Sequence, residues 1–401
     1  MSSPLRILQI APRLPWPLSI GGNIGIFNIT RALSRLGHEI TFVCFATDTS
    51  DPSPMSTFCD VRIVRHDTST RALSLFTNLF STWPYTISKY RCAAMHDTLR
   101  KLCRERSFDV VHVDHIHMAP YGVMLKEEFG LPLIIREHNF ETTIYERFAL
   151  QQTFPPLAWY MHMQTRRLLR FETRHVLQAD VVAAITDEDA ARIRQAAVVR
   201  HMEIVPAGVD LDAHNPSDPS LEHSATITLL GSMAWEPNLD AVLWFVSQIW
   251  PRIAGQHTGA RLIIAGAAPP RRIRELASER IEVRGFVEDL SGLLASSTVL
   301  AVPLRVGGGM RIKLLEYFAR AKAVVSTSIG AEGNLGRDGA HLLIADDAED
   351  FAAATLRLLH DPQLRRRLGA AARKLTEEVY SWEVIGRSFV QCYHNALGER
   401  R

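Results

Sequence analysis

The stretch TVLAVPLRVGGGMRIKLLEYFARAKAVVST, residues 298–327, decides the fold of this 401-residue chain. It begins as an apolar, β-branched run, passes through three consecutive glycines and continues as an amphipathic helical pattern. It ends in a second apolar run. A strand, a Gly-rich turn, a helix and another strand, in that order, are typical of a parallel sheet covered by helices. This stretch therefore predicts an α/β fold.

The same alternation continues through the whole chain. Besides the runs at Thr298 and Ala323, apolar runs begin at Leu5, Glu39, Val61, Asp109, Leu131, Asp180, Ala225, Ala260, Arg280 and His341. Helical patterns separate them, and residues 206–220 (PAGVDLDAHNPSDPS) have the composition of a linker. We therefore expect two Rossmann-like domains, 1–206 and 207–382, with parallel sheets that face each other across a cleft. A last helix, at about 383–401, is expected to pack back on the first domain.

The composition excludes several classes of protein. Hydrophobic residues make up 47% and charged residues 22%, which is too apolar for a disordered chain. Lys and Arg number 45 against 43 acidic residues, whereas nucleic-acid binders normally carry a strongly basic domain. The N-terminus, MSSPLRILQIAPRLPWP, is too polar and proline-rich for a signal peptide, and no run of 18 apolar residues occurs. Five scattered cysteines without C-x-x-C spacing favour reduced thiols. We expect a cytoplasmic protein without a nucleic-acid partner.

The three glycines and the helix after them predict an anion site. Glycines let a ligand approach the backbone, and the unpaired N–H groups of a helix N-terminus favour negative charge. At helical spacing Gly309, Lys313 and Glu316 share one face of the helix. Arg311 falls in the first turn, where the helix dipole disfavours a positive charge, and a bound anion would remove that penalty. Gly308, Gly309 and both cations could hold a diphosphate, and Glu316 a pair of hydroxyls. The alternative is a plain turn followed by a solvated Lys–Glu pair.

Two loops of the first half are further candidates. The loop after the first strand ends in Gly21-Gly22, with Asn23 as an expected N-cap. It departs from G-x-G-x-x-G, which counts against a nicotinamide or flavin site. His138 directly follows a buried strand among polar neighbours, which favours a ligand contact over a role in the core.

The segment HVDHIH, residues 112–117, has the composition of a metal cluster. Successive residues of a strand point to opposite faces of the sheet, so its three histidines and its aspartate are not expected to converge. We retain only His115, as a residue that lines the cleft. The two Asp pairs of the chain, one in the linker and one at an expected helix cap, offer no better set of ligands. We therefore expect no metal and no cofactor.

Taken together, the chain resembles the retaining glycosyltransferases of family 4, which have the GT-B fold. The segments that carry the resemblance are the Gly21-Gly22 loop, REHNFE (136–141), ADVVAAITDEDA (179–190), PAGVDLDAHNP (206–216), GGGMRIKLLE (307–316) and SIGAEG (328–333). REHN and GSMAWEPNLDAVLWF (231–245) are most similar to bacterial sugar transferases associated with exopolysaccharide genes.

The resemblance implies transfer of a hexose from a nucleotide diphosphate sugar to a glycan or lipid-linked acceptor, in polysaccharide biosynthesis. It implies that Glu316 holds the ribose hydroxyls and that Arg311 and Lys313 lie against the diphosphate. His138 matches the histidine near the transferred sugar, and Gly22 the loop that approaches the donor phosphate.

The sequence departs from the family pattern around the donor. Gly308 stands where members often carry a glutamate against the donor sugar, and Ser232 and Asn238 occupy the region of a usual Arg–Lys pair. The usual Asn of the linker is Ala207. Because the basic pair is missing, we add Arg305 to the cations expected to bind the donor.

Glu332 of the SIGAEG segment is another expected substrate contact. An alternative function is that of a nucleotide-sugar epimerase on the same fold, which needs acid and base carboxylates, and Glu137 and Glu332 are the only candidates. A non-catalytic, two-domain sugar-binding protein is a second alternative. The basic segments 89–106 and 161–176 are either solvated helix faces or a docking surface for an anionic membrane that carries a lipid-linked acceptor.

Overall fold

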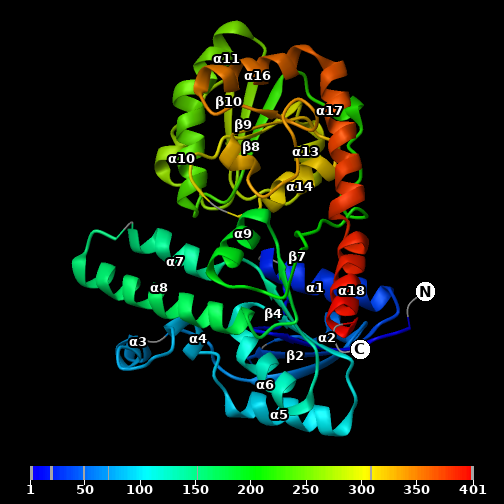
Figure 1. Ribbon diagram of the computed structural model, residues 1–401. Helices are drawn as coiled ribbons and strands as arrows, with labels where there is room; N and C mark the ends of the chain where they lie inside the picture. Colours follow the sequence, from blue (N-terminus) through cyan, green and yellow to red (C-terminus); the bar gives the residue numbers. More distant parts are fainter. Residues whose placement is uncertain are drawn as a thin grey trace. The chain divides into compact units, whose positions relative to one another are not determined.

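The computed structural model describes residues 3–18, 21–47, 50–70, 72–150, 152–307 and 309–398 (Figure 1). It divides into two compact units. The first unit comprises Met1–Pro206 together with Trp382–Arg401, and the second comprises Ala207–Ser381. Each unit is built on a parallel sheet, so the predicted α/β class is confirmed in both. Among the helices of the described ranges, none has the length and hydropathy needed to cross a membrane.

The sheet of the first unit has the strand order β3-β2-β1-β4-β5-β6-β7. Its strands are β1 (Arg6–Ala11), β2 (Glu39–Ala46), β3 (Asp60–Arg65), β4 (Val110–Asp114), β5 (Leu133–Glu137), β6 (Val181–Ala184) and β7 (His201–Ile204). Ile7 of β1 pairs with Ile40 on one side and Val110 on the other. The order reverses between β1 and β4, and ligands of such sheets bind beyond the carboxyl ends of the strands at that point.

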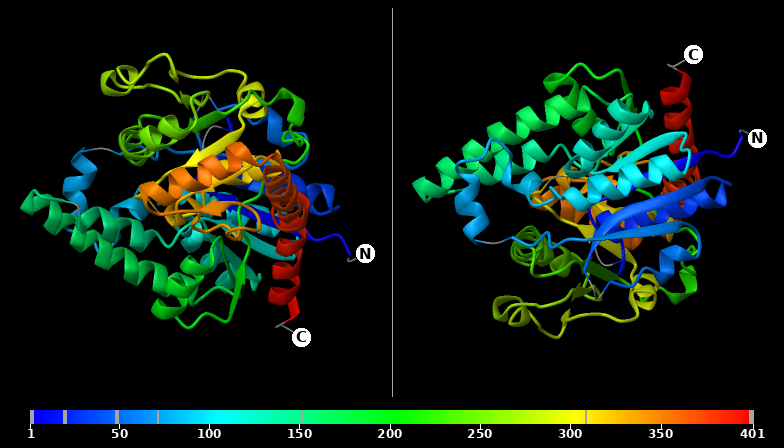
Figure 2. Two further views of the ribbon diagram at one scale, coloured as in Figure 1. Left: turned by 90° about the horizontal axis from the view of Figure 1, so that it is seen from above. Right: turned by 90° about the horizontal axis from the view of Figure 1, so that it is seen from below.

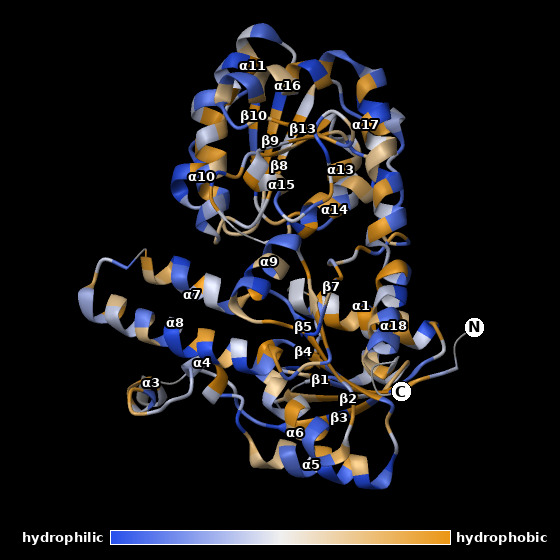
Figure 3. Cartoon of the chain, viewed as in Figure 1, coloured by the Kyte–Doolittle hydropathy of each residue, from blue (hydrophilic) through white to orange (hydrophobic). Residues whose placement is uncertain are grey.

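Helices cover both faces of this sheet. They are α1 (Gly21–Arg35), α2 (Ser53–Ser56), α3 (Ala72–Asn78), α4 (Tyr85–Ser88), α5 (Ala93–Glu105), η1 (Ile116–Met118), α6 (Ala119–Phe129), α7 (Glu141–Leu150), α8 (Pro155–Val176), α9 (Asp187–Ala196) and α18 (Trp382–Gly398). Leu8 of β1 packs in a core with Leu99 and Leu125, whereas Ile7 packs in another with Leu33 and Phe389. Strand alternation sends these neighbours to opposite faces, which explains why the strands are apolar throughout (Figure 3).

The last helix belongs to the first unit although the second unit precedes it in the chain. Figure 2 shows α18 beside α1, and Gly386 of α18 faces Ala32 of α1 so closely that a Cβ there would lie 3.1 Å from that side chain. Phe389 and Tyr393 of α18 are fully buried in the first unit. The C-terminal helix therefore completes one face of the first sheet.

The second unit repeats the architecture with the strand order β10-β9-β8-β11-β12-β13. Its strands are β8 (Thr226–Leu230), β9 (Arg261–Ala265), β10 (Ile281–Arg284), β11 (Val299–Val302), β12 (Val324–Ser326) and β13 (Leu343–Ile344). Its helices are η2 (Pro219–Leu221), α10 (Glu236–Trp244), η3 (Phe245–Ile249), α11 (Trp250–Gln256), α12 (Arg271–Arg274), α13 (Leu290–Ser296), α14 (Ile312–Ala319), α15 (Ser328–Ala331), α16 (Ala348–His360), α17 (Pro362–Leu375) and η4 (Thr376–Tyr380). The order reverses between β8 and β11, which places a ligand-binding point beside the Gly-rich loop after β11.

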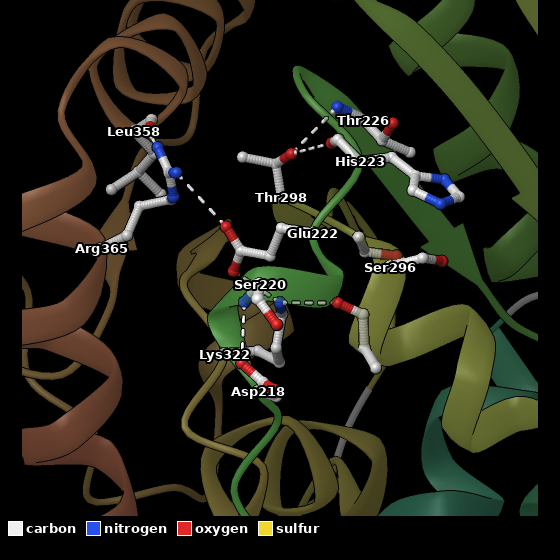
Figure 4. Close-up of polar contacts among 12 residues, drawn as sticks. Asp218, Ser220, Glu222, His223, Thr226, Ser296, Thr298, Lys322, Leu358 and Arg365 are labelled. Atoms are coloured by element: carbon white, nitrogen blue, oxygen red, sulfur yellow. Dashed lines mark hydrogen bonds and ion pairs between the residues drawn. The ribbon is translucent and has the colours of Figure 1, made fainter.

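Just after the linker, at Glu222, the chain is fixed to the second unit by ion pairs (Figure 4). Glu222 accepts a hydrogen bond of 2.7 Å from the ammonium group of Lys322, whose side chain is only 2% exposed. Arg365 of α17 binds the other carboxylate oxygen at 3.3 Å. Because an unpaired buried ammonium is costly, this pair fixes the segment that follows the linker to the second unit.

Three local expectations need correction. Helix α1 begins at Gly21, so Asn23 is its third residue and not its N-cap; the amide of Asn23 donates to the carbonyl of Pro17 at 3.1 Å. Helix α14 begins at Ile312, so Gly309 lies before the helix and shares no helical face with Lys313. Arg311 is the extended N-cap residue, with φ −89° and ψ 97°, and does not lie in the first turn.

Candidate functional site

The Gly-rich loop of the second unit places Arg311 against an aromatic ring. The guanidinium carbon lies 5.6 Å from the ring centroid of Trp235, the residue before α10, and only 7% of Arg311 is exposed. Gly307 has φ +143°, and a Cβ there would lie 2.4 Å from the guanidinium. Glycine is therefore required at this position for both backbone and space. Trp235 was missed by sequence reasoning, although the segment that contains it carried the resemblance.

Lys313, in the first turn of α14, reaches across to the carboxyl end of β8. Its ammonium group donates to the carbonyl oxygen of Leu230 at 3.0 Å and lies 3.5 Å from the amide oxygen of Asn238. Burial, with a contribution from the charge of Arg311, lowers the pKa of Lys313 to about 8. Two cations thus lie next to the N-terminus of one helix, an arrangement that an anion would stabilise.

Glu316 lies one turn after Lys313 on α14. Burial raises the pKa of its carboxyl group, and the nearby Arg320 opposes that shift. Within the described ranges, its side chain has neither a hydrogen bond nor an ion pair. The carboxylate oxygens are therefore available to accept hydrogen bonds from the hydroxyl groups of a ligand.

The other predicted residues of the second unit take different positions. Arg305 is bound to Asp240, with Nε 3.0 Å from the carboxylate, and lies over the ring of Trp244. Gly309 has φ +75°, a left-handed conformation that favours glycine. Glu332 directly follows α15 and is partly buried. Gly308 lies outside the described residues.

In the first unit, the predicted Gly22, His115 and His138 come together. A Cβ on Gly22 would lie 3.7 Å from Nε2 of His115 and 3.8 Å from Nδ1 of His138. The two imidazole rings are stacked, with centroids 3.6 Å apart and planes at 16°. His115 has φ +67°, an unusual conformation for a residue with a side chain. Gly21 is the first residue of α1 and is exposed. The first turn of α1 therefore faces two histidines at the point where the strand order reverses.

A buried hydrogen-bond network orients His138. Arg136 lies 2.6 Å from Nε2 of His138 and 3.3 Å from Asp114, and the amide of Gln9 donates to Asp114 at 2.6 Å. A guanidinium only donates hydrogen bonds, so Nε2 accepts and the neutral ring carries its proton on Nδ1. Burial and the charge of Arg136 lower the pKa of His138 to about 4, so the ring is neutral near pH 7. The proton on Nδ1 is on the side of Gly22.

Helix α18 contributes to the same network. The hydroxyl group of Tyr393 and Nδ1 of His112 share a hydrogen bond of 2.7 Å, and the ring of Phe389 stacks on His112 with centroids 4.9 Å apart. Nε2 of His112 lies 3.7 Å from Asp114. Sequence reasoning missed these partners because Tyr393 and His112 are 281 residues apart in the chain.

The segment HVDHIH divides between two places. His112 and Asp114 belong to the buried network. In His115, His117 and Glu141, by contrast, one ring nitrogen of each histidine and one carboxylate oxygen, the atoms that could bind a metal ion, all lie within 4.8 Å of one another. Burial and the charges of Lys89 and Arg13 lower the pKa of His117 to about 3. These cations make the surroundings unfavourable for a metal ion and favourable for an anion. The absence of a metal stays a prediction.

Comparisons with known proteins assign both units. Residues 21–208 match the model of the glycosyl transferase 4-like domain, and residues 224–361 match that of glycosyl transferases group 1. The chain is 26% identical to a D-inositol 3-phosphate glycosyltransferase of Nocardioides sp. over 73% of this chain and 69% of that protein. It is 20% identical to an uncharacterized 44.6 kDa protein in the cps region of Klebsiella pneumoniae, over 86% of this chain and 89% of that one.

Solved structures share the fold. A sucrose-phosphate synthase from Thermosynechococcus elongatus superposes with a TM-score of 0.70 at 18% identity, covering 98% of this chain and 100% of that one. Anabaena HepE in complex with UDP superposes with a TM-score of 0.68 at 12% identity, covering 97% and 99%. The two Rossmann-like units therefore have the fold of these solved structures.

Proposed function

Because the chain belongs to the glycosyltransferases with 4-like and group 1 domains, has the GT-B fold and is a hexosyltransferase, we propose that its donor is a nucleotide diphosphate sugar. The hexose passes with retention of configuration to a glycan or lipid-linked acceptor. The observation that carries this proposal is the grouping of Arg311, Lys313 and the uncommitted carboxylate of Glu316 around the start of α14. The structures of HepE with UDP and with UDP-glucose support the class of donor.

In this mechanism the cations of the second unit stabilise the leaving group. The bond between the anomeric carbon and the diphosphate breaks, and negative charge develops on the diphosphate. The acceptor oxygen bonds to the anomeric carbon on the same face, and its proton passes to the departing phosphate oxygen. The N–H groups at the start of α14, Arg311 and Lys313 then bind the diphosphate more strongly than in the ground state. Each well-placed donor of this kind lowers the barrier by roughly 3 kcal/mol. These groups perform the task of a metal ion, so the proposed reaction needs none.

His138 acts on the transferred sugar in this proposal. Its proton on Nδ1 is fixed by the hydrogen bond of Nε2 with Arg136, so the ring presents a donor on the side of Gly22. A neutral donor suits a sugar hydroxyl group, whereas an imidazolium would repel the positive charge that develops at the anomeric carbon.

The two alternatives are less well supported. An epimerase would use Glu137, but this carboxyl group is 1% exposed, and burial and Glu172 raise its pKa well above the usual value. A carboxyl group that is buried and protonated is poorly placed to exchange protons with a substrate. Relatives that are named glycosyltransferases favour catalysis over a sugar-binding protein without activity. Incubation of the enzyme with donor alone distinguishes them, because only an epimerase produces a new nucleotide sugar without acceptor.

The biological setting that we propose is polysaccharide synthesis in the cytoplasm, at the inner face of the membrane. The similarity to a protein of the Klebsiella cps region supports the polysaccharide role. Structural support for membrane contact comes from the hairpin of α7 and α8, which lie side by side and project from the first sheet (Figure 1). Large apolar side chains are exposed along it: Ile144, Phe148, Leu150, Phe154, Leu157 and Trp159. Arginines 166, 170 and 174 of α8 are exposed too.

An apolar tip flanked by arginines suits the interface of an anionic bilayer. In sedimentation with anionic vesicles, the wild type is expected in the vesicle pellet. Most of the doubly substituted Phe154→Ser/Trp159→Ser protein is expected to stay in the supernatant. Leu221→Ser, at an exposed leucine of the second unit, is the matched control and is expected to sediment like the wild type. Wild-type protein that ignores anionic vesicles would remove the membrane from the proposal.

Catalysis is tested by measuring release of nucleoside diphosphate from a panel of nucleotide sugars. Lys313→Ala is expected to lower kcat/KM by roughly 10²–10³-fold, the usual effect of removing one transition-state donor. Lys374→Ala removes an exposed lysine of the same unit and is expected to leave turnover unchanged. Unchanged turnover in Lys313→Ala would overturn the assigned role of this residue.

A further inference from the structure

The first unit contains a cavity that the donor site does not use. Its volume is about 530 Å³, which lies in the range of small-molecule sites. All its walls come from residues 66–91, around α3 and α4. The lining residues include Asp67, Asn78, Tyr85, Ser88, Lys89 and Arg91.

The lining has the chemistry of a site for a charged sugar. Serine, threonine and tyrosine supply most of the wall and can exchange hydrogen bonds with sugar hydroxyl groups. Lys89 and Arg91 add two cations against the single carboxylate of Asp67. In the part of the chain that the structure describes, neither cation has an ion-pair partner. Each lies instead against an aromatic ring, Lys89 at 5.3 Å from Tyr90 and Arg91 at 4.6 Å from Trp83.

The position of Lys89 strengthens this imbalance. Burial, with a contribution from the charge of Arg13, lowers the pKa of Lys89. The charged form of its ammonium group is therefore destabilised in the free protein. An anion in the cavity would supply compensating negative charge. The walls around Asn78 are fixed, because Gln164 and Arg167 of α8 bind its side chain and its carbonyl group.

Helix α4 connects the cavity to the histidines of the first unit. Tyr85 and Ser88 of α4 line the cavity, and Thr86 between them lies 3.1 Å from Nε2 of His117. His117 in turn lies beside His115, whose ring stacks on His138. Helix α4 therefore contacts both the cavity and the group of histidines that includes His115 and His138.

We propose that this cavity binds the acceptor, and that the acceptor carries an anionic group, a phosphate or a carboxylate, held by Lys89 and Arg91. This inference rests on the proposed function, since it names the class of acceptor for the same reaction. The hydroxyl-rich wall binds the sugar ring next to the anion. The hydroxyl group that receives the hexose is directed past Thr86 toward His138.

The test compares the binding of glucose 1-phosphate, glucuronate and glucose by calorimetry or ligand-detected NMR. The experiments use the full chain carrying Lys313→Ala, which weakens competing binding at the second unit. At least one anionic probe is expected to bind at least tenfold more tightly than glucose. Its identity separates the two sources of charge, because glucose 1-phosphate reports a phosphate and glucuronate a carboxylate. Equal affinities for all three, or no binding of any, would overturn the proposal.

Matched variants assign the effect to the cavity. Lys89→Ala/Arg91→Ala is expected to remove the tenfold preference, and Lys89→Arg/Arg91→Lys, which keeps both charges, is expected to restore it. Lys101→Ala/Arg104→Ala removes two exposed cations of α5 and is the control. A preference that survives in Lys89→Ala/Arg91→Ala would contradict the assignment.

Donor turnover without acceptor, measured in the chain that keeps Lys313, Lys89 and Arg91, separates the two proposals when it is set beside the probe preference of the Lys313→Ala chain. If hydrolysis of the donor persists while the preference for anionic probes is absent, the cavity is wrongly assigned and the donor site stands. If no nucleotide sugar is turned over while the anionic probes bind, the proposed reaction is wrong and the cavity stands.

Discussion

The ammonium group of Lys313 lies where burial and Arg311 both oppose its charge, and its pKa of about 8 is close to physiological pH. An anionic diphosphate stabilises the charged form, so binding raises this pKa. Affinity for a nucleoside diphosphate is then constant below pH 8 and falls above it, because the free protein has lost the proton that the complex requires. The decline approaches about tenfold per pH unit.

Calorimetric titration with UDP or GDP between pH 6.5 and 9 measures this dependence. Lys313→Arg keeps its charge throughout the range, so its affinity is expected to stay flat above pH 8. The same decline in Lys313→Arg would show that another group is responsible.

Gly307 is a second residue on which the proposed donor site depends. A methyl group there would lie 2.4 Å from the guanidinium of Arg311, and φ +143° is unfavourable for alanine. Gly307→Ala is expected to displace Arg311 and to weaken diphosphate binding roughly tenfold or more, the value of one charge-assisted hydrogen bond. Gly255→Ala, where nothing lies within 4 Å of the added carbon, is the control for the same calorimetric measurement. Wild-type affinity in Gly307→Ala would show that Arg311 does not bind the diphosphate.

At the scale of elements, apolar runs predicted the strands because buried parallel strands are apolar on both faces. Strand β7 was not predicted, because it lies at the edge of the sheet and has no fully buried residue, so its sequence carries no apolar run. The start of α14 was misplaced by three residues because glycine and extended residues precede it, and periodicity does not locate a helix end. The relative position of Lys313 and Glu316 was predicted correctly, because both lie in α14, one turn apart. Their role in binding a donor stays a prediction.

The segment that follows the linker is the element whose attachment can be tested by stability. Glu222→Gln leaves the ammonium group of Lys322 buried without its partner, which costs about 3–5 kcal/mol. The second unit is therefore expected to unfold at a lower urea concentration. Glu378→Gln breaks an exposed pair with Lys374 and is expected to cost under about 1 kcal/mol. Equal denaturation midpoints for the two variants would contradict the structural role of Glu222.

At the scale of the whole molecule, the chain leaves the first unit, builds the second and returns as α18. Sequence length indicated that the last helix packs back on the first unit, but not which side chains it would meet. The partners of His112 and Arg136 on this helix, Phe389 and Tyr393, have no local signal in the sequence. Contacts between distant segments depend on the completed fold.

The return of α18 gives a prediction for stability. Phe389→Ala removes a fully buried ring and is expected to destabilise the first unit by about 3–5 kcal/mol. Gln391→Ala, on the exposed side of the same helix, is the control. Urea denaturation monitored by fluorescence measures both. A Phe389→Ala protein as stable as Gln391→Ala would show that α18 does not complete the core.

The central claim, that α14 binds a nucleotide diphosphate sugar, is tested most directly by calorimetric titration of the wild type and Glu316→Ala with UDP, GDP and ADP. At least one nucleotide is expected to bind the wild type at a single site. Glu316→Ala is expected to bind it at least tenfold more weakly, since the ribose hydroxyl groups lose their acceptor, while Glu378→Ala binds like the wild type. Failure of all three nucleotides to bind, or wild-type affinity in Glu316→Ala, would contradict the claim.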